Sequence, residues 1–258
     1  MTTPDERPAT EDAVTRQVSE IMREAEGELV EVIAANPASH PSRHGLDQEL
    51  AEIKDHVLRM GSLVEEAILA AIAALVAHDA EAATSVIKND HRINEKQREI
   101  STLITRTIAT QSPVARDLRF LLSLDHVSYE LERMGDHAAS VAKQVIKLAP
   151  EPPLAEYVKL PEMAELGAQL VHSVLRALVD ADAVAAREAA VADDQIDLLY
   201  HATFDEVVEL MRQDPGNVER GTRIVIASHY LERIGDRSTN IAEDIVYLVT
   251  GDVEDLNP

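Results

Sequence analysis

Apolar residues recur along this chain at alternating spacings of three and four, which is the pattern of an α-helix with a narrow apolar seam. The pattern is clearest around two copies of one motif, Leu-Glu-Arg-Met-Gly-Asp at 131–136 and Leu-Glu-Arg-Ile-Gly-Asp at 231–236. The seam positions around the two copies are Leu124, Val127, Leu131, Met134, Ala138, Val141, Val145 and Leu148, then Ile224, Ala227, Leu231, Ile234, Ser238, Ile241, Ile245 and Leu248. A long motif that recurs in the same helical frame indicates a duplicated unit.

The same periodicity predicts two further helices before each motif helix. In the first half we expect helices at about 46–78 and 80–109, and a third that opens with Ser112 as N-cap and Pro113 in its first turn. In the second half we expect helices at about 161–180, 182–212 and from Pro215 to Gly251. The chain has no sustained run of alternating apolar and polar residues, the pattern that would predict a strand. Short loops between successive helices predict that these helices are antiparallel neighbours. The sequence therefore predicts an all-α fold, a six-helix bundle built from two tandem three-helix repeats.

Proline-rich and polar segments mark the boundaries of these units. The segment Pro150-Glu-Pro-Pro-Leu separates the repeats, which we place at 46–150 and 151–251, with a tail at 252–258. Residues 1–45 form an N-terminal extension, in which apolar residues from Val14 to Ile33 predict an amphipathic helix at about 12–34 and a linker follows.

Composition narrows the classes of partner and chemistry. The chain has 47 acidic and 24 basic residues, a net charge of −23, so direct binding to DNA or to an anionic membrane surface is not expected. It has no cysteine, which excludes disulfides, thiolate-ligated metals and thiol catalysis. The longest apolar run, Ala67–Ala77, is shorter than a membrane span, and the N-terminus has no apolar signal core. These features predict a cytoplasmic protein without membrane insertion.

Paired carboxylates are the strongest candidate for chemistry. Each motif carries a Glu and an Asp four residues apart, and such like-charged neighbours cost roughly 0.2–0.5 kcal/mol on a helix. If Leu131 and Leu231 occupy heptad position a, these carboxylates fall at b and f, away from the seam. The preceding helix of each half adds a second pair, so acidic faces of adjacent helices could converge. Hard oxygen ligands from facing helices suit iron, manganese, magnesium or zinc ions.

The second half offers the fuller set of candidate metal ligands, and we expect the first site to be weaker. The second set comprises Asp193, Asp197, Glu232, Asp236, Asn240 and Glu243. The first comprises Asp90, Asn94, Glu132 and Asp136, with Ser140 and Lys143 in place of Asn240 and Glu243.

Other interpretations of these residues stay open. In so acidic a chain the pairs could be solvated surface residues, or Arg133 and Arg233 could act as their intramolecular counterions. The carboxylates could serve a metal-dependent hydrolase or oxidase, or the bundle could be a purely structural scaffold. The sequence has no Glu-x-x-His, His-Glu-x-x-His, Gly-rich phosphate loop or Gly-x-Ser-x-Gly motif, which favours a binding module over an enzyme.

Gly135 and Gly235 lie in the middle of the motif helices, where a glycine costs about 1 kcal/mol relative to alanine. Their presence there indicates close packing between helices.

Taken together, the motifs resemble the PhoU family. The resemblance rests on the two Leu-Glu-Arg-Ile/Met-Gly-Asp helices, on Pro-Val-Ala-Arg-Asp-Leu-Arg at 113–119 and on Asn-Ile-Ala-Glu at 240–243, and it covers about 45–251. It implies a cytoplasmic negative regulator of phosphate uptake and of the phosphate-starvation response. Such proteins are regarded as adaptors between the ATPase subunit of the phosphate transporter and a sensor histidine kinase, and as homodimers. The resemblance also implies multinuclear iron, zinc or manganese clusters on the repeated carboxylates.

Overall fold

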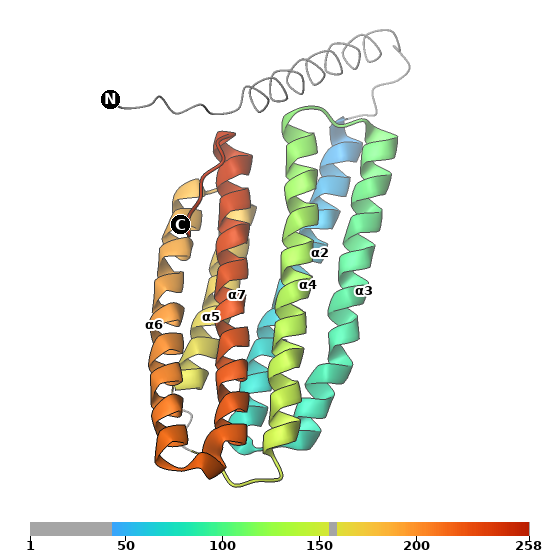
Figure 1. Ribbon diagram of the computed structural model, residues 1–258. Helices are drawn as coiled ribbons and strands as arrows, with labels where there is room; N and C mark the ends of the chain where they lie inside the picture. The colour runs from blue at the N-terminus through green and yellow to red at the C-terminus, as the bar shows by residue number, and fades with distance from the viewer. Residues whose placement is uncertain (1–42, 155–158, 258) are drawn as a thin grey trace, which may run out of the picture. The chain divides into compact units, whose positions relative to one another are not determined.

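The computed structural model describes residues 43–154 and 159–257 (Figure 1). The described residues from His44 onward belong to one compact unit. The predicted helix at 12–34 and its linker lie outside the described residues, so the N-terminal extension stays a prediction.

The described part of the chain is all-α, which confirms the predicted fold class. Six α-helices and one 3₁₀ turn follow one another within residues 43–154 and 159–257. They are α2 (Arg43–Ala77), α3 (Ala80–Gln111), α4 (Arg116–Leu148), α5 (Lys159–Asp180), α6 (Ala183–Gln213), η1 (Pro215–Asn217) and α7 (Val218–Thr250). Each half therefore contributes three helices, and the two motifs lie on the third helix of each half, α4 and α7.

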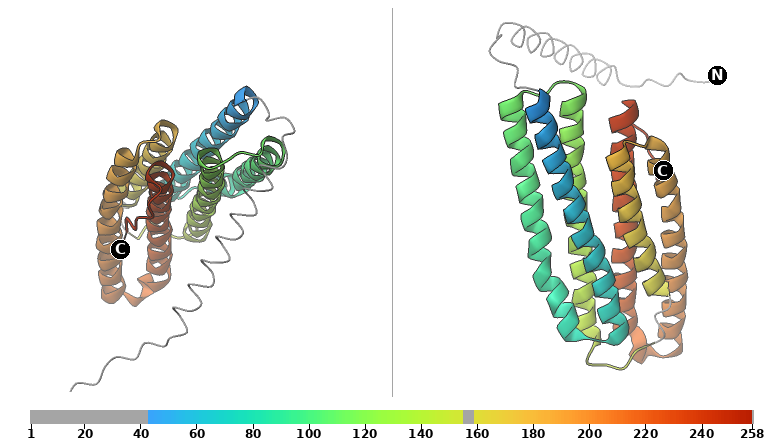
Figure 2. Two further views of the ribbon diagram at one scale, coloured as in Figure 1. Left: turned by 90° about the horizontal axis from the view of Figure 1, so that it is seen from above. Right: turned by 180° about the vertical axis from the view of Figure 1, so that it is seen from behind.

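The two motif helices pack against each other where the repeats meet. Within the unit that begins at His44, α4 and α7 run side by side, with α3 beyond α4 and α6 beyond α7 (Figures 1 and 2). The seam positions predicted around both motifs are buried, among them Leu131, Met134, Leu231 and Ile234. The narrow apolar seam thus forms the centre of one continuous core.

Equivalent turns begin the second helix of each half. Asp79 is the N-cap of α3 and accepts hydrogen bonds from the backbone N–H groups of Glu81 and Ala82, both at 2.9 Å. Asp182 is the N-cap of α6 and accepts from Val184 and Ala185 at 2.9 and 3.1 Å. These caps satisfy backbone donors that a helix start leaves unpaired. The duplication therefore extends to the helix caps, and the two caps show which positions of α3 and α6 are equivalent.

The predicted start of the third helix was wrong. Ser112 is not its N-cap but ends α3, in the left-handed region at φ 47°. The chain then turns through residues 113–115, and α4 begins only at Arg116. Ala115 also has a positive φ of 44°, so the proline marks a loop between two helices rather than a first helical turn.

Helix α2 is long and apolar enough, over His44–Ala77, to cross a membrane by length and composition alone. Its apolar side nevertheless lies in the core, where Ile53, Met60 and Ile68 are fully buried. Lys54 Nζ donates to the backbone carbonyl of Val179 on α5 at 3.0 Å. These contacts are those of a core helix in a helical bundle.

Candidate functional site

Four carboxylates of the second repeat converge where α6 meets α7. Asp193 and Asp197 lie on α6, and Glu232 and Asp236 lie on α7. Asp193 is only 3% exposed, and the other three are partly buried rather than turned away from the helix contact. The prediction that the motif carboxylates point away from the packed side was therefore wrong for Glu232 and Asp236. The prediction that the acidic faces of the two helices converge is supported for this half.

Burial and mutual repulsion favour the protonated forms of these groups. Burial, followed by the charges of Asp197 and Asp236, raises the pKa of Asp193 to about 7. Burial and the same two carboxylates raise the pKa of Glu232 to about 7. The pKa of Asp197 is also raised, again by burial first and by Asp236 second. The site thus concentrates negative charge that water and protein donors compensate poorly.

Two carboxylate oxygens of this cluster are buried without a hydrogen-bond donor, Asp193 Oδ1 and Glu232 Oε2. The other Asp193 oxygen, Oδ2, accepts from the Thr239 hydroxyl at 3.2 Å. Glu232 Oε2 lies 3.2 Å from His229 Nδ1, close enough for an ion pair if the imidazole is protonated, but not aligned as a hydrogen bond. Unpaired buried acceptors are rare, and each calls for a proton, an ion or a water molecule.

The glycines of both motifs permit close helix contacts, as predicted. A β-carbon on Gly235 would lie 1.9 Å from Asp193 Oδ1, so α7 can approach this carboxylate only with a glycine there. On Gly135 it would lie 2.8 Å from Ile93 Cδ1 and 3.4 Å from Asp90 Oδ1. In both halves the motif glycine faces the acidic side chain of the preceding helix.

The first repeat has a sparser version of the same cluster. Asp90 and Asn94 lie on α3, Glu132 and Asp136 on α4, and Asp136 is exposed. Asp90 Oδ2 accepts from Asn94 Nδ2 at 3.3 Å, while Asp90 Oδ1 is buried and unpaired. Burial and the charge of Asp136 raise the pKa of Asp90, and the hydrogen bond from Asn94 opposes this rise. Burial, then Asp136 and Asp90, raise the pKa of Glu132. Three carboxylates converge here against four in the second repeat.

Asn240 and Glu243, the remaining candidates, have other partners in this structure. Asn240 Nδ2 donates to Glu130 Oε2 of α4 at 3.3 Å. Glu243 Oε1 accepts from the backbone N–H of Leu256, in the C-terminal tail, at 2.9 Å. The converging set of the second repeat is therefore Asp193, Asp197, Glu232 and Asp236.

The counterion interpretation holds in part. Arg233 NH1 lies 3.3 Å from Asp236 Oδ2, so the motif arginine of α7 pairs with a site carboxylate. Arg133 NH1 instead lies 4.0 Å from Glu130, outside the first-repeat cluster. One arginine does not neutralise four converging carboxylates.

The donor chemistry fits divalent or trivalent cations, but the described residues do not form a closed cage. Within residues 44–154 and 159–257, no three Asp, Glu or His side chains are already arranged around one ion position. The carboxylates with unpaired oxygens would have to turn toward a shared ion. Carboxylates on flexible side chains can do this, and such ions take oxygen ligands of this kind.

Sequence reasoning missed a buried carboxylate between the repeats. Glu130 on α4 is 3% exposed, and its Oε2 accepts from Arg237 NH1 of α7 at 3.2 Å as well as from Asn240. Nearby, His126 of α4 hydrogen-bonds Asp244 of α7. Glu130 directly precedes the seam residue Leu131, and that position is the signal that could have placed it beside the facing helix.

His137, which follows the motif carboxylate Asp136, lies partly buried against the facing motif helix. Its ring stacks on Tyr230 of α7 with centroids 5.6 Å apart, and its Nε2 is buried without a partner. Burial, then the positive charges of Arg237 and Arg233, lower the pKa of His137 to about 4. A neutral imidazole therefore packs between the motif helices.

The fold and the site assign this chain to a class of duplicated helical bundles. Its two three-helix repeats carry carboxylates at equivalent places on their second and third helices. Two segments of this chain, 57–145 and 160–245, match the PhoU domain. The chain belongs to the PhoU family.

Curated relatives match nearly from end to end. A protein of Clostridium acetobutylicum is 36% identical over 217 residues, which are 84% of this chain and 99% of that protein. One of Streptococcus pneumoniae is 36% identical over 215 residues, 83% of this chain and 100% of that protein. Both are named phosphate-specific transport system accessory protein PhoU homolog. The names describe accessory proteins of a transport system, in agreement with the prediction of a non-enzymatic protein.

Two solved structures share the fold. The crystal structure of PhoU from Pseudomonas aeruginosa superposes with a TM-score of 0.76 at 35% identity, over 80% of this chain and 99% of that chain. The phosphate transport system regulatory protein PhoU from Streptococcus pneumoniae also gives 0.76, at 37% identity, over 81% and 99%.

Proposed function

We propose that this protein is a negative regulator of phosphate uptake and of phosphate-starvation signalling. In this role it is a cytoplasmic adaptor between the ATPase subunit of the phosphate transporter and a sensor histidine kinase. The observation that carries the proposal is the match at 36% identity, over 84% and 83% of this chain, to accessory proteins of phosphate-specific transport. The acidic surface supports an indirect effect on transcription, because a chain with a net charge of −23 is ill suited to bind DNA.

The proposal includes metal ions on the repeated carboxylates. Asp193, Asp197, Glu232 and Asp236 would hold the better-occupied site, and Asp90, Glu132 and Asp136 the weaker one. Bound iron, zinc, manganese or magnesium would supply the positive charge that the unpaired oxygens lack. The ions would thereby join α6 to α7 and α3 to α4. A homodimer is a further part of the proposal, which sedimentation velocity on the full chain tests.

The experiment that tests the regulatory role compares strains of the source organism with and without this gene in phosphate-rich medium. Alkaline phosphatase activity is expected to rise on deletion, because the starvation response would no longer be held off. A plasmid copy of the wild-type gene should restore repression. Unchanged activity in the deletion strain, with the transporter and kinase genes intact, would contradict the proposal.

A further inference from the structure

The solvent-facing side of α6 carries a line of apolar side chains, which we call the α6 stripe. It consists of Val184, Val191 and Leu198, which are 63%, 69% and 63% exposed. Their spacing of seven residues places them almost on one line, which is about 21 Å long. The outer side of a surface helix normally carries polar residues, so three exposed apolar side chains aligned there point to a binding surface.

The first repeat provides an internal comparison. The N-caps Asp79 and Asp182 set α3 and α6 in the same register. In that register the stripe positions are occupied on α3 by Glu81, Lys88 and Glu95, all of them exposed. The fold therefore accepts charged residues at these positions. The apolar side chains of the second repeat serve something other than the packing of this unit.

The stripe has acidic residues on both sides. Glu188 and Asp194 are exposed and lie three residues before and after Val191, one on each side of the stripe. On α6 itself the nearest basic residue in sequence, Arg187, is already engaged. Its Nε and NH2 donate to the two carboxylate oxygens of Glu254 at 2.8 and 2.5 Å. Arg176 of α5 lines the adjoining groove between α5 and α6, but Asp180, Asp182 and Glu188 line it too, so the surroundings of the stripe are negatively charged on balance.

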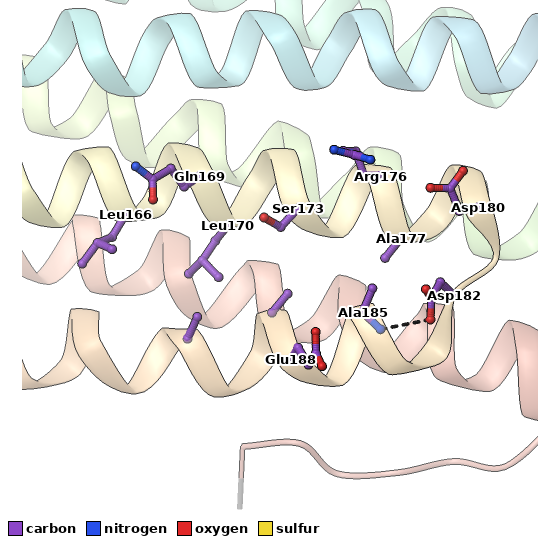
Figure 3. A pocket seen from close by; sticks show the side chains of 12 residues that line it. Leu166, Gln169, Leu170, Ser173, Arg176, Ala177, Asp180, Asp182, Ala185 and Glu188 are labelled. Carbon is purple, nitrogen blue, oxygen red and sulfur yellow. Dashed lines mark hydrogen bonds between the residues drawn. The ribbon is translucent and has the colours of Figure 1, made fainter.

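A groove between α5 and α6 adjoins the stripe and widens this surface. It has a volume of about 450 Å³, and Leu166, Leu170 and Ala177 point from α5 toward α6, with Glu188 at its α6 edge (Figure 3). In the first repeat a smaller groove of about 50 Å³ between α2 and α3 overlaps these positions in part. Ala189 and Ala192 stand in the second repeat where Val86 and Asn89 stand in the first. Smaller side chains and exposed apolar residues are therefore concentrated on the same helix.

We propose that the α6 stripe and its adjoining groove dock an amphipathic helix of a partner protein, with basic residues on either side of its apolar face. Helices bind such surfaces through apolar residues at i, i+3, i+4 and i+7. Charge selects this occupant over a second copy of the chain, because each copy carries a net charge of −23 and would bring its own acidic flanks to the contact. The inference uses the adaptor role only in that an adaptor needs a partner surface, and it makes no use of a bound metal.

The test uses a defined probe and the full chain. The probe is a fluorescein-labelled helical peptide of about 21 residues, long enough to span the stripe, with leucines at heptad positions and Lys or Arg beside them. One control peptide has the same composition with the leucines out of register, and another has Glu in place of the basic residues. Fluorescence anisotropy is expected to show saturable binding of the first peptide alone.

Variants of the chain test whether the stripe is the docking surface. Installing the first-repeat residues with Val184→Glu, Val191→Lys and Leu198→Glu should weaken binding by about tenfold or more, because apolar anchors dominate such contacts. This variant is one charge more negative than wild type, so repulsion of a basic peptide cannot explain a loss. Val191→Glu alone should weaken binding in the same direction, although its added charge would attract a basic peptide. Leu122→Glu, a similar change at an exposed site on α4, should leave it unchanged.

The proposal is overturned by any of three results: no binding of the in-register peptide, equal binding of the out-of-register peptide, or equal binding by the triple variant. Circular dichroism should show that the triple variant is folded, and Val191→Glu gives the answer if it is not. Sedimentation that shows a wild-type dimer and a monomeric triple variant would also overturn it, since the stripe would then join two copies. If the peptide binds as expected but deletion of the gene leaves alkaline phosphatase activity unchanged, the regulatory role is refuted and the docking surface is not.

Discussion

Gly235 and Asp193 define the tightest contact of the candidate site, since a β-carbon on the glycine would lie 1.9 Å from Asp193 Oδ1. The backbone of α7 therefore closes over the most buried carboxylate of the cluster. A glycine inside a helix costs about 1 kcal/mol relative to alanine, and here it provides the space that the acidic side chain occupies. The same contact holds the two helices together and fixes the most buried potential ligand.

Replacing this glycine should destabilise the bundle. Gly235→Ala would force Asp193 or α7 to shift, and overpacking of this kind costs about 1–3 kcal/mol, part of which the better helix propensity of alanine offsets. Urea unfolding monitored by circular dichroism measures the difference. Gly167→Ala is the matched control, because its nearest neighbour would be Ile234 Cγ2 at an ordinary 3.5 Å. The control should be as stable as wild type or more so. Equal stability of the two variants would mean that the contact is not tight.

Stability should fall as the pH rises from about 4 to about 7. The pKa of Asp193 rises from 3.8 to about 7 on folding and that of Glu232 from 4.5 to about 7, so in this range these two groups bind more protons in the folded state than in the unfolded state. His137, whose pKa falls to about 4, acts in the opposite direction and offsets part of this difference. The free energy of unfolding then decreases with pH, because deprotonation places charges in a buried acidic cluster. Asp193→Asn should raise the free energy of unfolding at pH 7.5 by roughly 1–3 kcal/mol and flatten its decline between pH 5 and 7.5.

The measurement is urea unfolding at several pH values with a chelator present, so that no bound cation offsets the repulsion. Glu165→Gln, at an exposed position of α5, removes one charge outside the cluster and should leave the pH profile unchanged. A profile of Asp193→Asn that parallels wild type would show that this carboxylate is not responsible.

Helical periodicity was sufficient to predict the all-α class, the two three-helix repeats and the buried seam. It placed Leu131 and Leu231 in the core because apolar residues at alternating spacings of three and four form one side of a helix. It could not place the start of α4, because a Ser-Pro pair such as Ser112-Pro113 is as common in a loop as at the start of a helix. Only the left-handed backbone of Ser112 and Ala115 shows which of the two is realised.

The candidate site was predicted in outline but not in detail. The repeated carboxylates identified Asp193, Asp197, Glu232 and Asp236, because they lie on helices that short loops make neighbours. The partners of Asn240 depend on the contact between the two repeats, and no periodicity within one helix reports that contact. The buried Glu130 was missed for the same reason, since its stabilising partner Arg237 lies on the other repeat.

The pair formed by Glu130 and Arg237 should contribute strongly to the contact between the repeats. Glu130→Ala leaves the guanidinium of Arg237, whose side chain is only 15% exposed, without its buried partner. Removing one member of a buried ion pair costs about 3–5 kcal/mol, and urea unfolding should show a loss of that order. Combining Glu130→Leu with Arg237→Leu should recover most of the stability, because two apolar side chains need no counterion. A double variant that is as unstable as Glu130→Ala would mean that the loss comes from altered packing rather than from an unpaired charge.

Added divalent cations should stabilise the protein through the second-repeat carboxylates. At pH 7.5, Mn²⁺ is expected to raise the melting temperature of the metal-free wild type, since an ion that binds only the folded state adds about 2.7 kcal/mol at one hundred times its dissociation constant. The variant with Asp193→Asn and Glu232→Gln should lose most of this shift, and one with Glu132→Gln and Asp136→Asn should lose less. The effect should be weaker at pH 6, because protons then compete for the same oxygens.

The matched control for the cation experiment removes two carboxylates from α6 without touching the cluster. Asp205→Asn with Glu188→Gln changes the net charge by the same amount at exposed positions, so it separates specific ligation from general attraction of cations to an acidic protein. Wild type and control should therefore show the same Mn²⁺-dependent shift. If the cluster variant also shows that shift, the carboxylates do not bind the ion, and partial neutralisation by Arg233 at 3.3 Å from Asp236 becomes the better account of why they are tolerated.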